Sequence, residues 1–179
     1  DPTQPVYLLL HGLTGGSSEE YIRDFTHRQQ SQRQSSSSTV IVMVARGLMD
    51  LPIRGWNTFH GARISDVHTA AQTIRRTIDQ VATTTTTSLS RPPVVKYCKN
   101  FTISTTRTTL IGVGYSMGAI ILSNYAASYG RECPLDGAIA FSGGLDMRDQ
   151  RNFYRAQRLW QPMLADTLRY DFLLGKWGY

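Results

Sequence analysis

Short apolar runs alternate along this chain with stretches of helical periodicity, and this alternation constrains the fold more than any other feature. The apolar runs occupy residues 6–10, 39–45, 109–114 and 136–143. Such continuous runs are typical of buried strands in a parallel sheet that helices cover on both sides. Strands that alternate with helices are joined by right-handed crossovers. We therefore predict an α/β fold, a parallel sheet with helices on both of its faces.

Two helices are expected in the first half of the chain. Ser17 stands three residues before Glu20, the spacing of a capping box, and predicts a helix that fades in the polar tract at about 29–38. The next helix is marked by one apolar face, formed by Ile64, Val67, Ala71, Ile74, Ile78 and Val81. The threonine-rich segment at about 83–106 contains a proline pair and predicts a mostly disordered insertion.

Two further helical segments lie in the second half. Residues 119–130 predict a helix with Gly130 as its C-cap. The tail from Leu145 has a helical pattern that Pro162 interrupts. Its large apolar residues are Phe153, Tyr154, Leu159, Trp160, Leu164, Leu168, Tyr170, Phe172, Leu173 and Trp177. With 179 residues the chain is long enough for one domain.

Residues 110–122, LIGVGYSMGAIIL, place a serine between two glycines where an apolar run gives way to a helix. Gly114, Ser116 and Gly118 match the G-x-S-x-G nucleophile elbow, in which a strained strand-to-helix turn exposes the serine hydroxyl. The partial positive charge of a helix N-terminus favours an anion that develops there. The alternative is that the glycines only allow close packing and that Ser116 is an ordinary helix cap.

A glycine-rich loop, HGLTGG over residues 11–16, follows the first apolar run. In acyl-transfer enzymes of this architecture, an N–H of this loop and the N–H after the serine bind the carbonyl oxygen. We therefore assign the oxyanion hole to the backbone amides of Leu13 and Met117. We expect His11 to hold the loop through hydrogen bonds and not to transfer protons.

The two motifs, in this order and each after a strand, resemble those of the α/β-hydrolase superfamily. Residues 8–25, 57–74, 112–130 and 134–146 are similar to the AB hydrolase 4 family, which includes abhydrolase-domain lipases, yeast medium-chain acyl esterases and embryogenesis-associated hydrolases. The resemblance implies a serine carboxylesterase or lipase that acts on carboxylic esters of lipid or medium-chain acyl type, without a metal or cofactor. It also implies a helical cap that begins at about 147–179, and packing of this tail onto the sheet is the alternative.

All four histidines precede Ser116, whereas in this fold the acid and the histidine of the triad follow the serine. His60 lies in a predicted loop and His68 on the polar side of the most regular helix, so we expect solvated or locally bonded roles for both. Among the later carboxylates only Asp146 has a suitable position. We therefore expect a partial domain, truncated at both ends, that is close to inactive alone. The alternatives are an acyltransferase to alcohols and a non-catalytic fragment or binding module.

Charge and composition limit the classes of binding partner that the chain can have. The net charge is +6, but the arginines are scattered and no nucleic-acid motif is present, so we expect a solvated surface and no nucleic-acid partner. Weak attraction to anionic membrane surfaces is the alternative. Cys98 and Cys133 lack the spacing of a zinc site and are expected to be reduced thiols. No signal or membrane-spanning segment is visible, which favours a cytoplasmic or membrane-associated location.

Overall fold

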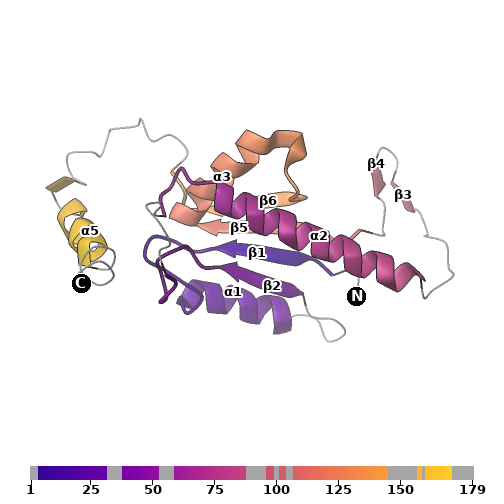
Figure 1. Ribbon diagram of the computed structural model, residues 1–179, viewed down its shortest axis with the longest axis horizontal. Helices are drawn as coiled ribbons and strands as arrows, with labels where there is room; N and C mark the ends of the chain where they lie inside the picture. The colour runs from indigo at the N-terminus through magenta and orange to yellow at the C-terminus, as the bar shows by residue number, and fades with distance from the viewer. Residues whose placement is uncertain are drawn as a thin grey trace.

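The centre of the molecule is a four-stranded sheet. The computed structural model describes residues 4–31, 38–52, 59–87, 96–98, 101–103, 107–144, 157–158 and 160–170. The strands of the sheet, in spatial order, are β2 (Thr39–Met43), β1 (Val6–Leu10), β5 (Leu110–Tyr115) and β6 (Gly137–Phe141) (Figure 1). All three neighbouring pairs are parallel. The predicted parallel sheet is therefore confirmed.

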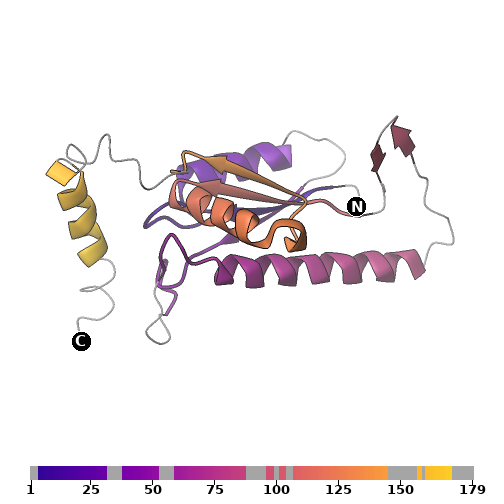
Figure 2. The same ribbon diagram turned by 90° about the horizontal axis from the view of Figure 1, so that it is seen from above.

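Helices cover both faces of this sheet. Helix α1 (Glu20–Ser31) lies on one face, and α2 (Ser65–Thr87) and α3 (Met117–Tyr129) lie on the other (Figure 2). Successive side chains of a strand point to opposite faces. Accordingly, the buried Leu8 of β1 packs with residues of α2 and α3, and the buried Leu9 packs with α1. The all-apolar sequence of β1 thus reflects burial on both sides, and the predicted α/β layering is confirmed.

The register of the strands brings two loops to the same edge of the sheet. Leu10, the last residue of β1, is level with Gly114 of β5, and Tyr115 is level with Phe141 of β6. Because the strands are parallel, the chain leaves them at the same edge. In open α/β sheets the edge at the carboxyl ends of the strands is where ligands bind. The loop after β1 and the turn after β5 therefore emerge side by side.

The start of helix α1 differs from the prediction. The helix begins at Glu20, and the carbonyl of Glu19 accepts hydrogen bonds from the amides of Ile22 and Arg23 at 3.1 and 3.0 Å. Ser17 lies too far ahead to cap the helix, and its amide instead contacts the sulfur of Met49 at 3.1 Å. The capping box assigned to Ser17 is therefore wrong. The helix also continues into the polar tract as far as Ser31, and residues 32–37 lie outside the described residues.

Helix α2 extends beyond its predicted apolar face. Val67 and Ala71 are buried, as predicted, but Val81 is 61% exposed because the helix continues past the sheet (Figure 1). Helical structure continues to Thr87. Further along, β3 (Lys96–Cys98) pairs antiparallel with β4 (Phe101–Ile103). The expectation of a mostly disordered segment at 83–106 is thus wrong for these parts, and 88–95, 99–100 and 104–106 lie outside the described residues.

Strand β6 is more exposed than its sequence predicts. Four of its five residues are exposed, and Ile139 and Phe141 expose 44% and 45% of their surface. The reason is its place at the edge of the sheet, where, among the described strands, only β5 pairs with it. The prediction of a strand was correct, and the prediction that it is buried was wrong.

The tail contains helix α5 (Gln161–Leu168), and Pro162 lies in its first turn. Proline is tolerated there because the first amides of a helix have no internal partner, so Pro162 does not break the helix. Trp160, Met163 and Leu164 are exposed, so for these residues packing onto the sheet is wrong. Residues 145–156, 159 and 171–179 lie outside the described residues, and the start of a cap stays a prediction. Among the described helices, none is both long and apolar enough to cross a membrane.

Candidate active site

Ser116 occupies the turn between β5 and α3. Its backbone has φ 52° and ψ −115°, and a non-glycine residue with positive φ stores about 1–3 kcal/mol of strain. The surrounding backbone holds this conformation, since the amide of Ser116 donates to the carbonyl of Phe141 at 2.8 Å. The side chain is exposed and makes no capping hydrogen bond. The predicted strained strand-to-helix turn is therefore present, and Ser116 occupies the N-cap position of α3 without a side-chain capping bond.

The two glycines that flank Ser116 are required for space. A Cβ on Gly114 would lie 2.5 Å from the carbonyl oxygen of Gly118. A Cβ on Gly118 would lie 2.4 Å from the carbonyl oxygen of Leu10 and 2.6 Å from that of His11. Each of these distances is shorter than any stable contact. The glycines thus let helix α3 approach both its own strand and the loop after β1.

The glycine-rich loop after β1 lies against the serine turn. A Cβ built on Gly12 would be 3.4 Å from the Cβ of Ser116. The loop turns tightly, because Thr14 has φ 55° and the amide of Gly15 donates to the carbonyl of Gly12 at 3.2 Å. Within the described part of the chain, no acceptor binds the amide of Leu13 or Met117. The two amides that sequence assigns to an oxyanion hole therefore belong to adjoining segments.

His11 is buried below this loop and uses both ring nitrogens. The amide of Ala45 donates to Nε2 at 3.0 Å, so Nδ1 carries the proton and donates to the carbonyl of Gly12 at 2.7 Å. Burial lowers the pKa of His11, although the bond to Gly12 and the charge of Glu19 oppose this effect. A neutral imidazole with both nitrogens bonded is not available as a base. His11 thus holds the loop, as predicted.

Three curated proteins are similar to this chain over most of its length. An abhydrolase domain-containing protein of Dictyostelium discoideum is 28% identical over 169 residues, 92% of this chain and 36% of that protein. A monoacylglycerol lipase of Saccharomyces cerevisiae is 24% identical over 94% of this chain and 32% of its own length. The embryogenesis-associated protein EMB8 of Picea glauca is 26% identical over 76% of this chain and 23% of its own length. The chain thus spans about a third or less of these relatives.

No protein-family profile and no solved structure matches the chain. The relatives, the parallel sheet and the helices on its two faces nevertheless indicate the same fold. The chain has the α/β-hydrolase fold. The names of the first two relatives agree with the resemblance to the α/β-hydrolase superfamily. The narrower assignment to the AB hydrolase 4 family stays a prediction.

None of the other described histidines is placed to act as a base for Ser116. The prediction that His68 lies on the polar side of its helix is wrong, because its ring contacts Tyr125 and Tyr129 of α3. Its ring stacks on Tyr129 with centroids 4.1 Å apart, and Nδ1 lies 3.3 Å from the hydroxyl of Tyr125. The placement was wrong because His68 lies four residues after Ile64, on the core stripe of the helix. His60 and His27 are exposed, and no described histidine side chain hydrogen-bonds to Ser116.

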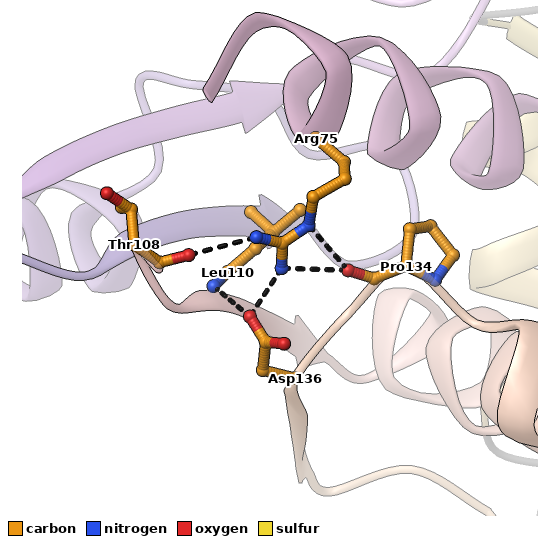
Figure 3. Close-up of polar contacts among 5 residues, drawn as sticks. All are labelled: Arg75, Thr108, Leu110, Pro134 and Asp136. Atoms are coloured by element: carbon orange, nitrogen blue, oxygen red, sulfur yellow. Dashed lines mark hydrogen bonds and ion pairs between the residues drawn. The ribbon is translucent and has the colours of Figure 1, made fainter. Parts of the chain in front are cut away.

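The carboxylate of Asp136, directly before β6, has partners that lie away from Ser116. Asp136 pairs with Arg75 and accepts from the amide of Leu110 at 2.7 Å (Figure 3). Leu110 is the first residue of β5, whereas Ser116 follows its last residue. Asp146, Asp149 and Asp171 lie outside the described residues. Where the chain is described, no cluster of three potential metal ligands is found, and Cys133 is a free thiol.

Arg75 is the residue that sequence reasoning missed. It was counted among the scattered arginines of a solvated surface, but its side chain is only 7% exposed. Its guanidinium donates to the carbonyl of Thr108 at 2.9 Å and twice to that of Pro134, at 3.1 and 2.9 Å (Figure 3). The available signal was its spacing, since Arg75 lies four residues after Ala71 on the apolar face of α2.

Proposed function

We propose that the complete protein is a serine hydrolase that cleaves carboxylic esters of lipid or medium-chain acyl type. The proposal rests on one observation above all: an exposed, strained serine without a capping bond, packed against a glycine loop. The yeast relative carries the name monoacylglycerol lipase, which supports a lipid ester as the substrate. The activity is proposed for the complete protein because the first two relatives are about three times longer than the region that this chain matches.

In the proposed reaction, Ser116 Oγ attacks the ester carbonyl carbon while its proton passes to a base. The backbone amides of Leu13 and Met117 donate to the oxygen that becomes negative. The tetrahedral intermediate then expels the alcohol, which takes up the proton, and an acyl-enzyme remains on Ser116. Water attacks the acyl-enzyme, releases the carboxylic acid and restores the serine. We expect the base to be a histidine outside these 179 residues.

The proposal is tested by labelling the complete protein with a fluorophosphonate probe. We expect the wild type to be labelled on Ser116, with the site located by mass spectrometry of its peptides, and Ser116→Ala to lose labelling and esterase activity. Ser142→Ala is the matched control, because Ser142 is also exposed, also follows a strand and also has positive φ, at 55°. The control should be labelled like the wild type. Equal labelling of Ser116→Ala and the wild type would overturn the proposal.

A further inference from the structure

The hydroxyl of Tyr21 lies inside the glycine-rich loop. Tyr21 belongs to the first turn of α1, and its Oη accepts a hydrogen bond from the amide of Gly12 at 3.0 Å. The loop closes around this oxygen, since a Cβ on Gly12 would be 3.5 Å from Oη and one on Gly15 would be 3.0 Å from it. The hydroxyl therefore has a specific partner in the segment that precedes Leu13.

This hydrogen bond fixes one end of a peptide unit whose other end faces the nucleophile helix. The C=O and N–H of a trans peptide point in opposite directions. The carbonyl oxygen of His11 lies against Gly118, where an added Cβ would be 2.6 Å away, and the N–H of Gly12 points to Tyr21. The His11–Gly12 peptide is thus held between α3 and α1.

The next peptide unit carries the amide of Leu13. Its carbonyl, that of Gly12, accepts from His11 Nδ1 at 2.7 Å and from the amide of Gly15 at 3.2 Å. Because the unit is planar, these bonds to its oxygen also set the direction of the Leu13 N–H. Two consecutive peptide units are therefore oriented by hydrogen bonds, the first by Tyr21 from outside the loop and the second by His11 and Gly15 within it.

The ring of Tyr21 also contacts the other half of the site. Its centroid lies 4.8 Å from that of Tyr115, the residue before Ser116. Tyr115 in turn stacks on Phe141, whose carbonyl accepts from the amide of Ser116. One side chain thus contacts both segments that carry the proposed oxyanion donors, through its hydroxyl on one side and its ring on the other.

We propose that Tyr21 is a positioning residue whose hydroxyl holds the Leu13 amide in line with Ser116. The inference rests on the proposed function, because it assigns a role within that site. It separates the hydroxyl from the ring, since phenylalanine keeps the contact with Tyr115 and removes only the acceptor for Gly12. A ring that acts only in packing would tolerate this change.

The test compares Tyr21→Phe with Tyr7→Phe in the complete protein. Tyr7 packs in the same apolar cluster as Tyr21, and its ring contacts Phe25. We expect Tyr21→Phe to lower kcat for a medium-chain ester about 10- to 100-fold with little change in KM, below the 10²–10³-fold loss of a whole oxyanion donor. Hydrogen exchange of the Gly12 amide, followed by mass spectrometry with fragmentation of peptides over 11–16, should become at least about fivefold faster. Tyr7→Phe should change neither value.

Each result decides one part of the proposal. Unchanged exchange at Gly12 in Tyr21→Phe overturns it whatever the activity. Faster exchange with kcat equal to that of Tyr7→Phe shows a tether without a catalytic role and also overturns it. Failure of the proposed function is recognised separately, by a wild type without esterase activity and with the same labelling as Ser116→Ala. In that case the hydrolase role of Tyr21 fails together with the proposed function, while exchange at Gly12 still reports whether the tether exists.

Discussion

At one end of strand β5 the chain is held by a buried arginine, and at the other end it turns through a strained, exposed serine. Arg75 binds the two carbonyls and the carboxylate at the amino ends of β5 and β6, so its polar groups have partners. Ser116 has positive φ and a hydroxyl without a capping partner. The comparison indicates that the sheet is fastened at the end away from the site, which allows strain at the end where chemistry is proposed.

The largest effect is expected from removing the side chain of Arg75, which tests whether this residue stabilises the amino ends of β5 and β6. We expect Arg75→Met to lower the free energy of unfolding by about 3 kcal/mol, because it removes three hydrogen bonds to two carbonyls and the cationic partner of Asp136. The effect is at the lower end for a broken buried pair because the Asp136 side chain is 32% exposed. Urea unfolding of the complete protein measures it. Arg28→Met is the control, since Arg28 and Asp24 form an exposed pair worth less than about 0.5 kcal/mol. Equal losses in both variants would refute the fastening role of Arg75.

The second prediction concerns the close approach of α3 to the loop after β1. Gly118→Ala should cost about 2–3 kcal/mol and abolish esterase activity, because the new methyl group overlaps the carbonyl oxygens of Leu10 and His11. Gly137→Ala in β6 should be nearly neutral, since a Cβ there meets nothing within 4 Å. Thermal unfolding and ester hydrolysis, measured on both variants, check the pair. An active and stable Gly118→Ala would mean that the loop can move away from the serine.

Much of this arrangement follows from sequence because it depends on local patterns. The strand before Ser116, the helix after it and the small residues on either side were predicted from apolar runs and glycine spacing, and all are present. The glycine loop followed from its place after β1. The contact of Tyr21 with Gly12 was not predicted. Apolar periodicity and glycine spacing do not indicate a hydrogen bond between the first turn of a helix and a loop amide nine residues earlier.

The predictions for His68 and Arg75 were wrong for one physical reason, which is that polar side chains can occupy core positions when their partners come from distant segments. His68 and Arg75 both lie on the stripe of α2 that includes Ala71 and Ile78, yet their polarity alone predicted that they face solvent. The partners of Arg75 come from residues 33 to 61 positions later in the chain. The exposure of β6 was missed for the converse reason, since an apolar run does not reveal whether a neighbour covers it.

The third prediction concerns the backbone strain at Ser116 and its separation from the reactivity of the serine hydroxyl. Ser116→Gly should raise the free energy of unfolding by about 1 kcal/mol, because glycine adopts positive φ without penalty, while activity and fluorophosphonate labelling are lost. Ser142→Gly relieves the strain at a second positive φ, so it should be stabilised to a similar extent but keep its labelling. Chemical denaturation with parallel labelling checks both variants. A loss of stability in Ser116→Gly would show that the serine turn carries no strain.

The smallest effect is expected from His11, whose protonation should make the free energy of unfolding depend on pH. Burial lowers the pKa of His11, with the bond to Gly12 and the charge of Glu19 opposing, so the folded state binds a proton less readily than the unfolded state. The unfolded histidine titrates near pH 6.5, hence its contribution is present above that pH and is lost as the pH falls toward the lower folded pKa. We expect a loss of less than about 1 kcal/mol between pH 7 and 5.5.

Substitution should separate His11 from the other titrating groups. His11→Gln cannot take up a proton, so the free energy of unfolding should change less between pH 7 and 5.5 than in the wild type. Asp66 contributes in another window: burial alone would raise the pKa of its carboxyl, but Arg46 and Arg63 lower it, so its contribution is lost only below about pH 4. Urea unfolding at a series of pH values provides the slopes. If His11→Gln keeps the wild-type slope, the imidazole is not held neutral beneath the loop, and the hydrogen bond from Ala45 that fixes its tautomer does not persist in solution.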